Sequence, residues 1–363
     1  MIRTFLLVCL GASILVGSLA PEVTGSDGTV DPRLKNVLAD WQRRQNWFDA
    51  VEYKVSGKHV IPQGSYSDAF KGLEEVMGLP LDKFIPPKKV EGAVSFTILI
   101  DFGKGRERRS IHDQLFEIAT GKLTEMEMQD TFDGTEMKCL IPKEKNPGGQ
   151  IGVTQPELTS VKGNMKNGQF LSSYYPVFFA HGRIYTALEP ILPDKLRNKP
   201  NPNNLFVHGT DVYKDHQCLI IRTLPVGPDL TPPPFFEYWV DIDRENAIVR
   251  YLSYAGKVAH EEISIDYVKS EGHWLPTTWR WTVLHGGKPL YFDEMIVQKI
   301  TFNPSVKDKD FELPPVKPGM LIEERVDLPT SDPIKTPESK IWIYRIDDKG
   351  KRIPIPRSIS PER

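Results

Sequence analysis

Apolar and polar residues alternate along many short stretches of this chain, from residue 51 almost to its end. The alternation is clear in 51–55, 94–100, 123–131 and 217–224. Because successive side chains of a β-strand point to opposite faces, a period of two predicts strands with one buried face. The 31 prolines and 27 glycines are spread along the whole sequence and interrupt helices. The pattern therefore disfavours a helical bundle and predicts a mainly β fold.

Turn residues separate the predicted strands at short intervals. Asp133-Gly134 precedes the strand 137–141, and residues 243–246 divide 235–242 from 247–254. Strands linked by such turns form antiparallel hairpins. The rest of the second half is almost continuous strand, in 258–268, 273–284 and 289–302. We therefore expect one antiparallel sheet.

One clear helix precedes the strands. Asp31 is a good N-cap residue, and Pro32 suits the first helical position. Apolar residues then recur at intervals of three and four, at Leu34, Val37, Leu38, Trp41 and Phe48. A second, aromatic block at 170–185 is expected to contain short helices.

The first residues have the features of a secretory signal peptide. Arg3 precedes an apolar run from Phe5 to Leu19, which is short for a membrane span of about twenty residues. We expect cleavage after Gly25, so that residues 1–25 are removed and the mature protein is exported to the periplasm or the extracellular space, without spanning a membrane. The alternative is an uncleaved anchor.

Two cysteines, Cys139 and Cys218, remain after the signal peptide. In an oxidising compartment they could form one disulfide, and both are predicted on strands of one sheet. The alternative is a pair of free, buried thiols. Neither cysteine has the spacing of a redox motif or a zinc site.

The sequence contains few patterns that indicate chemistry. The formal net charge of −2 excludes a generic binder of nucleic acids. No nucleophile elbow, phosphate loop, dinucleotide fingerprint or zinc-protease motif is present. The basic stretch 104–109 is predicted to be a solvated strand rather than a phosphate site. We therefore predict no catalytic residue, no metal and no cofactor.

Large aromatic residues are concentrated in the later strands, at Trp239, Trp274, Trp279 and Trp281 among others. In a curved sheet they would line a hydrophobic binding cavity. The simpler alternative is that they form the core beneath a covering helix. The residues predicted to line the cavity are Val94, Phe96, Ile98, Trp279, Trp281, Phe292, Ile296 and Ile300.

Two polar residues interrupt the last of these strands. Strict alternation would put Glu294 and Gln298 on the same face as Phe292 and Ile296. A carboxylate on an apolar wall is costly unless water or a polar head group reaches it. Glu294 therefore either lies near the mouth of the cavity or indicates a β-bulge that shifts the register.

Several hairpin landmarks follow one another along the chain: the N-terminal helix, the run 236–241 with its turn, Gly272 to Thr277, and Ile300 to Asn303. Their order resembles the LolA/LolB lipoprotein-localisation superfamily. The resemblance covers residues 31–319, with a loop-rich insertion around 142–234. A proline-rich tail with a short hairpin follows at 320–363.

This resemblance implies a strongly curved antiparallel half-barrel with helices as a lid over an apolar cavity. Family members carry acylated proteins across the periplasm, receive them at the outer membrane, or act as RseB-like sensors. For this chain it implies a non-enzymatic carrier whose partners are lipid acyl chains or lipoproteins. The alternative is a sensor domain with a membrane-protein partner. The carriers have a basic residue that contacts the lid, and the resemblance does not identify it with any one of Arg43, Arg44 and Arg183.

Overall fold

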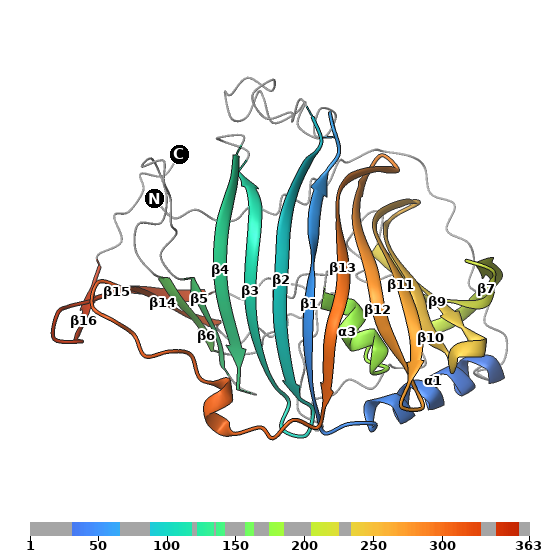
Figure 1. Cartoon of the computed structure of the whole chain (residues 1–363), viewed down its shortest axis with the longest axis horizontal. Helices are drawn as coiled ribbons and strands as arrows, with labels where there is room; N and C mark the ends of the chain where they lie inside the picture. The colour runs from blue at the N-terminus through green and yellow to red at the C-terminus, as the bar shows by residue number, and fades with distance from the viewer. Residues whose placement is uncertain are drawn as a thin grey trace.

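The computed structural model describes residues 31–65, 88–117, 122–133, 136–141, 157–162, 174–184, 205–224, 234–327 and 339–355. The predicted signal peptide, residues 1–25, lies outside these ranges. Within them, sixteen strands form one sheet (Figure 1), so the mainly β, antiparallel prediction is confirmed, apart from one parallel pair. The strands are β1 (Ala50–Ile61), β2 (Val90–Asp101), β3 (Arg106–Glu117), β4 (Lys122–Phe132), β5 (Glu136–Ile141), β6 (Glu157–Lys162), β7 (Leu205–Tyr213), β8 (His216–Thr223), β9 (Pro234–Asp241), β10 (Ala247–Ala255), β11 (Val258–Ser270), β12 (His273–His285), β13 (Lys288–Phe302), β14 (Leu321–Asp327), β15 (Ser339–Ile346) and β16 (Arg352–Pro354).

Strand β1 lies inside the sheet, between β2 and β13. On one side of β1, strands β2 to β6 follow in chain order as a meander. On the other side, β7 forms the far edge of the sheet, and strands β8 to β13 follow in chain order back toward β1. β14 then pairs in parallel with β6, and β15 and β16 follow at the edge. Strands from the expected insertion and from the expected tail thus belong to the same sheet.

Three two-residue turns connect hairpin strands in the second half of the chain. Lys214-Asp215, Glu271-Gly272 and Gly286-Gly287 each have positive φ at both residues. This backbone is the signature of a type I′ turn, whose twist matches the twist of the flanking strands. The pairing of β7 with β8, β11 with β12 and β12 with β13 is therefore encoded locally.

Two α-helices and two 3-10 turns accompany the sheet in the described residues: α1 (Pro32–Gln45), α3 (Tyr175–Ala180), η4 (Ile242–Arg244) and η5 (Asp308–Phe311). The Asp31 carboxylate accepts a hydrogen bond from the Arg33 backbone N–H at 2.8 Å, as predicted for an N-cap. Helix α3 falls within the aromatic block at 170–185 and contacts β10 and β12 (Figure 1). No helix of the described ranges is long and apolar enough to cross a membrane.

The main core lies on the face of the sheet that α1 and α3 cover, which we call the inner face. Leu34, Val37 and Trp41 of α1 are buried there, and all six residues of α3 are buried. A second, smaller core joins β5 to β14 and β15 through Leu140, Met320, Ile322 and Ile346.

Candidate functional site

The inner face brings together most of the residues predicted to line a cavity. Val94, Phe96 and Ile98 of β2 are buried, and so are Trp279 and Trp281 of β12. The rings of Phe96 and Trp279 lie 6.2 Å apart, although β1 and β13 separate their strands. Ile300, opposite Tyr53 of β1, packs against the same core.

Phe292 and Ile296 lie on the opposite, outer face. Ile296 is 52% exposed, and the Arg280 guanidinium stacks 3.6 Å from the Phe292 ring centre. The reason is a β-bulge in β13. Lys299 pairs with Lys54 and Val297 with Val55, so the strand register skips Gln298.

Of the two explanations for the polar residues of β13, the bulge is therefore confirmed. Glu294 is also on the outer face, 3.2 Å from the Lys58 ammonium. The inner face instead carries its neighbour, the buried Asp293. Strict alternation predicted the wrong face for Glu294 because an irregular residue shifts the pattern by one.

An aromatic wall covers one half of the inner face. It consists of the buried rings of Phe96, Tyr238, Tyr251, Trp279 and Trp281. Helix α3 packs its own rings on this wall. Phe179 lies 5.6 Å from Tyr251 and 6.0 Å from Tyr238, and Tyr174, just before α3, lies 4.6 Å from Phe96, between ring centres.

The two ends of α3 are held differently. At its C-terminal end, the Ala180 carbonyl accepts a hydrogen bond from the Arg44 guanidinium at 3.2 Å, and the Gly182 carbonyl accepts one from the Gln45 amide at 2.9 Å. Gly182 has φ +63°, and a Cβ there would lie 2.2 Å from the Trp41 carbonyl oxygen. The N-terminal end has no side-chain cap and lies on the wall through ring contacts.

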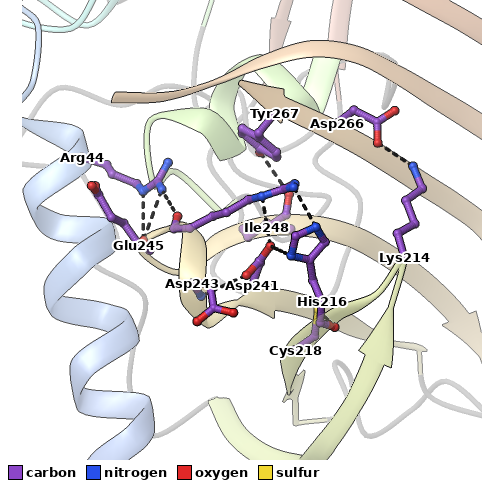
Figure 2. A network of polar contacts seen from close by, with 11 residues as sticks. Arg44, Lys214, His216, Cys218, Asp241, Asp243, Glu245, Ile248, Asp266 and Tyr267 are labelled. Carbon is purple, nitrogen blue, oxygen red and sulfur yellow. Dashed lines mark hydrogen bonds and ion pairs between the residues drawn. The ribbon is translucent and has the colours of Figure 1, made fainter. Parts of the chain in front are cut away.

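Arg44 also ties α1 to the turn after β9 (Figure 2). Its guanidinium is buried and donates to the backbone oxygens of Arg244 at 2.8 Å and Glu245 at 3.2 Å. Burial lowers the Arg44 pKa, and the carbonyl oxygens replace the lost water. This arginine therefore joins three elements around the C-terminal end of α3.

The same network contains a cysteine beside a histidine, without the chemistry of a nucleophile. The Arg244 guanidinium donates to His216 Nε2 at 2.8 Å, so the proton of this imidazole is on Nδ1, which faces Asp241 at 3.4 Å (Figure 2). Burial raises the pKa of Cys218 to about 11. The thiol therefore stays protonated and is not activated for attack.

Cys139 and Cys218 are not bridged to each other. They lie on strands of the same sheet, as predicted, and nine strands separate β5 from β8 in the sheet order. No group of three or more histidine, cysteine, aspartate or glutamate side chains in the described part of the chain is arranged to hold a metal ion.

The other half of the inner face carries a charged cluster: His59, Glu107, Arg109, Asp113, Asp130 and Asp293. His59 of β1 lies between two carboxylates, hydrogen bonded to Asp293 through Nδ1 and 2.6 Å from Asp113 through Nε2. Its partner on β2 is Gly92, which has no side chain, so the imidazole reaches across β2 to Asp113 on β3.

The ionisation of His59 follows from these partners. Burial alone would lower its pKa, but the hydrogen bonds to Asp113 and Asp293 outweigh burial and raise the pKa to about 10. Burial also raises the pKa of Asp293, which the bond to His59 counteracts. His59 is therefore a permanent cation at neutral pH.

Arg109 holds the rest of the cluster. Its guanidinium lies 2.8 Å from Asp130 on β4 and 3.2 Å from Glu107 on its own strand, and all three side chains are buried. Burial raises the pKa of Glu107 to about 7. One cation thus faces two buried carboxyl groups.

Sequence reasoning missed this cluster. The prediction that 104–109 is a solvated strand was wrong, because Arg106 and Arg109 are buried in ion pairs, the former with Asp101 at 2.6 Å. The available indication was Glu107, Arg109 and Asp113 at even intervals of two and four on one strand. Their pairing with Asp130 and His59 depends on the register of four strands, β1 to β4, which no local pattern gives.

No protein-family model matches the sequence, and no curated protein matches it. Among solved structures, the chain is similar to a DUF1329 family protein from Desulfovibrio piger, with a TM-score of 0.42 and 13% identity over 77% of this chain and 97% of that one. It is also similar to a domain from Vibrio parahaemolyticus named for outer membrane lipoprotein sorting, with a TM-score of 0.42 and 10% identity over 77% and 95%. The lipoprotein LppX from Mycobacterium tuberculosis matches at a TM-score of 0.25 and 9% identity, over 76% and 98%. None of these likenesses assigns a function.

Proposed function

We propose that this protein is a non-enzymatic carrier of the cell envelope that binds the acyl chain of a lipid or of an acylated protein on its inner face. The observation that best supports the proposal is the way in which helix α3 covers the aromatic wall. That cover is a six-residue helix, fixed by polar bonds at its C-terminal end and by ring contacts at its N-terminal end. A helix this short has little stability of its own. A chain would enter under the N-terminal end of α3.

The inner face is proposed to be the concave side of a strongly curved half-barrel. Phe96 and Trp279 stand on strands three steps apart, which a flat sheet would hold about 14 Å apart. Their rings are nevertheless 6.2 Å apart. Side chains converge in this way on a concave surface. Gly57, between them, adds to the close packing, since a Cβ there would lie 2.7 Å from the Met295 sulfur.

The two halves of the inner face suit an amphipathic ligand. Each methylene buried on the wall contributes about 0.8 kcal/mol. The charged cluster beside the wall offers ionic groups to a polar head group, with the His59 side chain 21% exposed. Because many methylenes share the binding energy, we expect the loss of any one wall contact to weaken binding without abolishing it.

The proposal includes export of the protein from the cytoplasm. The secretory signal predicted for 1–25 would deliver the mature chain to the periplasm or outside the cell, where residues 31–319 would act as the carrier domain. The chain from 320 onward would then extend the sheet at its edge.

A second candidate is a sensor or interaction domain of the RseB-like kind, with a membrane-protein partner. Phe178 and Phe179 of α3 are both buried, and the Phe179 ring lies against Tyr238 of the wall, so the helix itself fills part of the inner face. In that case the wall would serve as a core only, and acyl ligands would not bind.

Titration with a fluorescent fatty acid and an acylated peptide tests the proposal. We expect saturable binding by the wild type and at least about tenfold weaker binding by Trp281→Glu, which places a charge beside the chain. The matched control is Ile296→Glu, on the exposed outer face, which should bind as the wild type does. Circular dichroism verifies that both variants are folded. If the folded wild type shows no saturable binding, the carrier function is wrong and the sensor domain takes its place.

A further inference from the structure

Two tryptophans stand next to each other on the inner face of β12 and differ in their hydrogen bonding. Trp281 donates its indole N–H to a Glu261 carboxylate oxygen at 2.5 Å. Trp279 is only 2% exposed, yet its indole nitrogen has no hydrogen-bond partner among the described residues. Buried donors in folded proteins nearly always have a partner. An exception within the aromatic wall therefore needs an explanation.

The described neighbours of Trp279 on the sheet offer no good acceptor. Across the sheet it faces Ile265 on β11 and Met295 on β13, and its ring borders Phe96. Two of these side chains have no acceptor atom, and a thioether sulfur is a weak one. The partner of this N–H must therefore come from outside the wall.

We propose that the Trp279 indole N–H donates a hydrogen bond to a carbonyl oxygen of the bound ligand. The ligand class is then an ester- or amide-linked acyl chain rather than a bare hydrocarbon. This inference rests on the proposed function, because the acyl chain has to reach Trp279. A carbonyl is a neutral acceptor, which is far less costly to bury than a carboxylate. It is also attached directly to the chain that the wall would hold.

The test compares two lipids that are identical except for an ester or an ether linkage, each competing with a bound fluorescent acyl probe. The wild type should bind the ester lipid about tenfold more tightly, because only the ester offers a carbonyl oxygen. Trp279→Phe should remove the preference. Trp281→Phe is the matched control and should keep it, since that N–H is already bound to Glu261.

The outcomes separate this inference from the proposed function. Equal affinity of the wild type for both lipids, or a preference that survives in Trp279→Phe, overturns the role of Trp279 and leaves acyl binding intact. Failure of both lipids to bind removes the proposed function, and this inference with it.

A second measurement, by NMR, uses only the wild type, so it does not depend on whether Trp279→Phe folds. In wild-type protein labelled with 15N-tryptophan, the ester lipid should shift one of the seven indole N–H resonances downfield, and the ether lipid should leave that resonance in place. Identical spectra with the two lipids would contradict the inference.

Discussion

The aromatic wall and the charged cluster share one face of one sheet, but they are stabilised in opposite ways. The wall is held by the burial of large rings, so each side chain contributes roughly according to its volume. In the cluster, two cations face four carboxyl groups, and each buried charge depends on a partner. Removing one of the two cations leaves carboxylates buried and unpaired, which costs more than the contact was worth. The wall should therefore tolerate apolar substitutions of similar shape, and the two cations of the cluster should not tolerate replacement.

Arg109→Met removes the cation that faces Glu107 and Asp130, and it should give the largest effect. We expect a loss of about 3–5 kcal/mol in the free energy of unfolding at pH 7. Urea denaturation measures it. The control is Arg280→Met, whose side chain is 46% exposed on the outer face and should cost less than about 1 kcal/mol. A similar loss of unfolding free energy in the two variants would show that the cluster is no more sensitive than an exposed ion pair.

Adjacent residues of β13 sharpen the distinction between the two faces. Met295 is 2% exposed on the inner face, and Ile296 is 52% exposed on the outer face. Met295→Ala should cost about 2–4 kcal/mol in the free energy of unfolding, because it leaves a cavity beside the wall. Ile296→Ala should change it by less than about 0.5 kcal/mol. The reverse order, measured by the same denaturation, would mean that the bulge at Gln298 is misplaced.

These two residues also show how far the sequence predicts the structure. Alternation over 94–100 predicts the strand and the inner face of β2 correctly, because β2 pairs regularly with both of its neighbours. In β12 it places Trp279 and Trp281 on one face correctly, although the register with β11 shifts at Thr277. The same rule fails in β13. A bulge depends on how β13 pairs with β1, about 250 residues away in the sequence, so no local pattern gives its position.

The candidate site was predicted only in part, for a related reason. Apolar members of the inner face follow from periodicity, as Phe96 and Trp279 do. His59, Arg109 and Asp130 have the pattern of ordinary polar residues of exposed strands. Only the pairing of β1 to β4 shows that Arg109 and Asp130 are buried and that His59 is half-buried beside Asp113. The position of α3 over the wall is likewise a tertiary property, although its aromatic composition indicated burial.

The pH dependence of stability should come from the cluster rather than the wall. The folded-state pKa of His59, about 10, lies above its ordinary value of 6.5. Its stabilising contribution is therefore complete below pH 6.5 and is lost as the pH rises through 10. We expect the wild type to lose on the order of 2 kcal/mol more than His59→Gln between pH 7 and pH 10.5. Parallel stability curves for the two proteins would show that this imidazole is not held as a cation.

Replacing Glu107 should have the smallest effect on the free energy of unfolding, and it should stabilise the protein. Burial raises its folded-state pKa to about 7 from 4.5, so its contribution is present below pH 4.5 and is lost as the pH rises through 7. Glu107→Gln keeps the shape without the buried charge and should raise the free energy of unfolding by about 1–2 kcal/mol at pH 8, and by less at pH 5. A destabilised variant at pH 8 would mean that the ion pair with Arg109 outweighs burial.

Native mass spectrometry of the protein purified from an exporting host tests acyl-chain binding most directly. If the inner face binds acyl chains, a fraction of the molecules should carry the added mass of an acyl lipid or acylated peptide, which is released on denaturation. This fraction should be strongly reduced in Trp281→Glu but not in Ile296→Glu. A wild-type spectrum that contains only the bare mature chain, even after incubation with envelope lipids and acylated peptides, would contradict it.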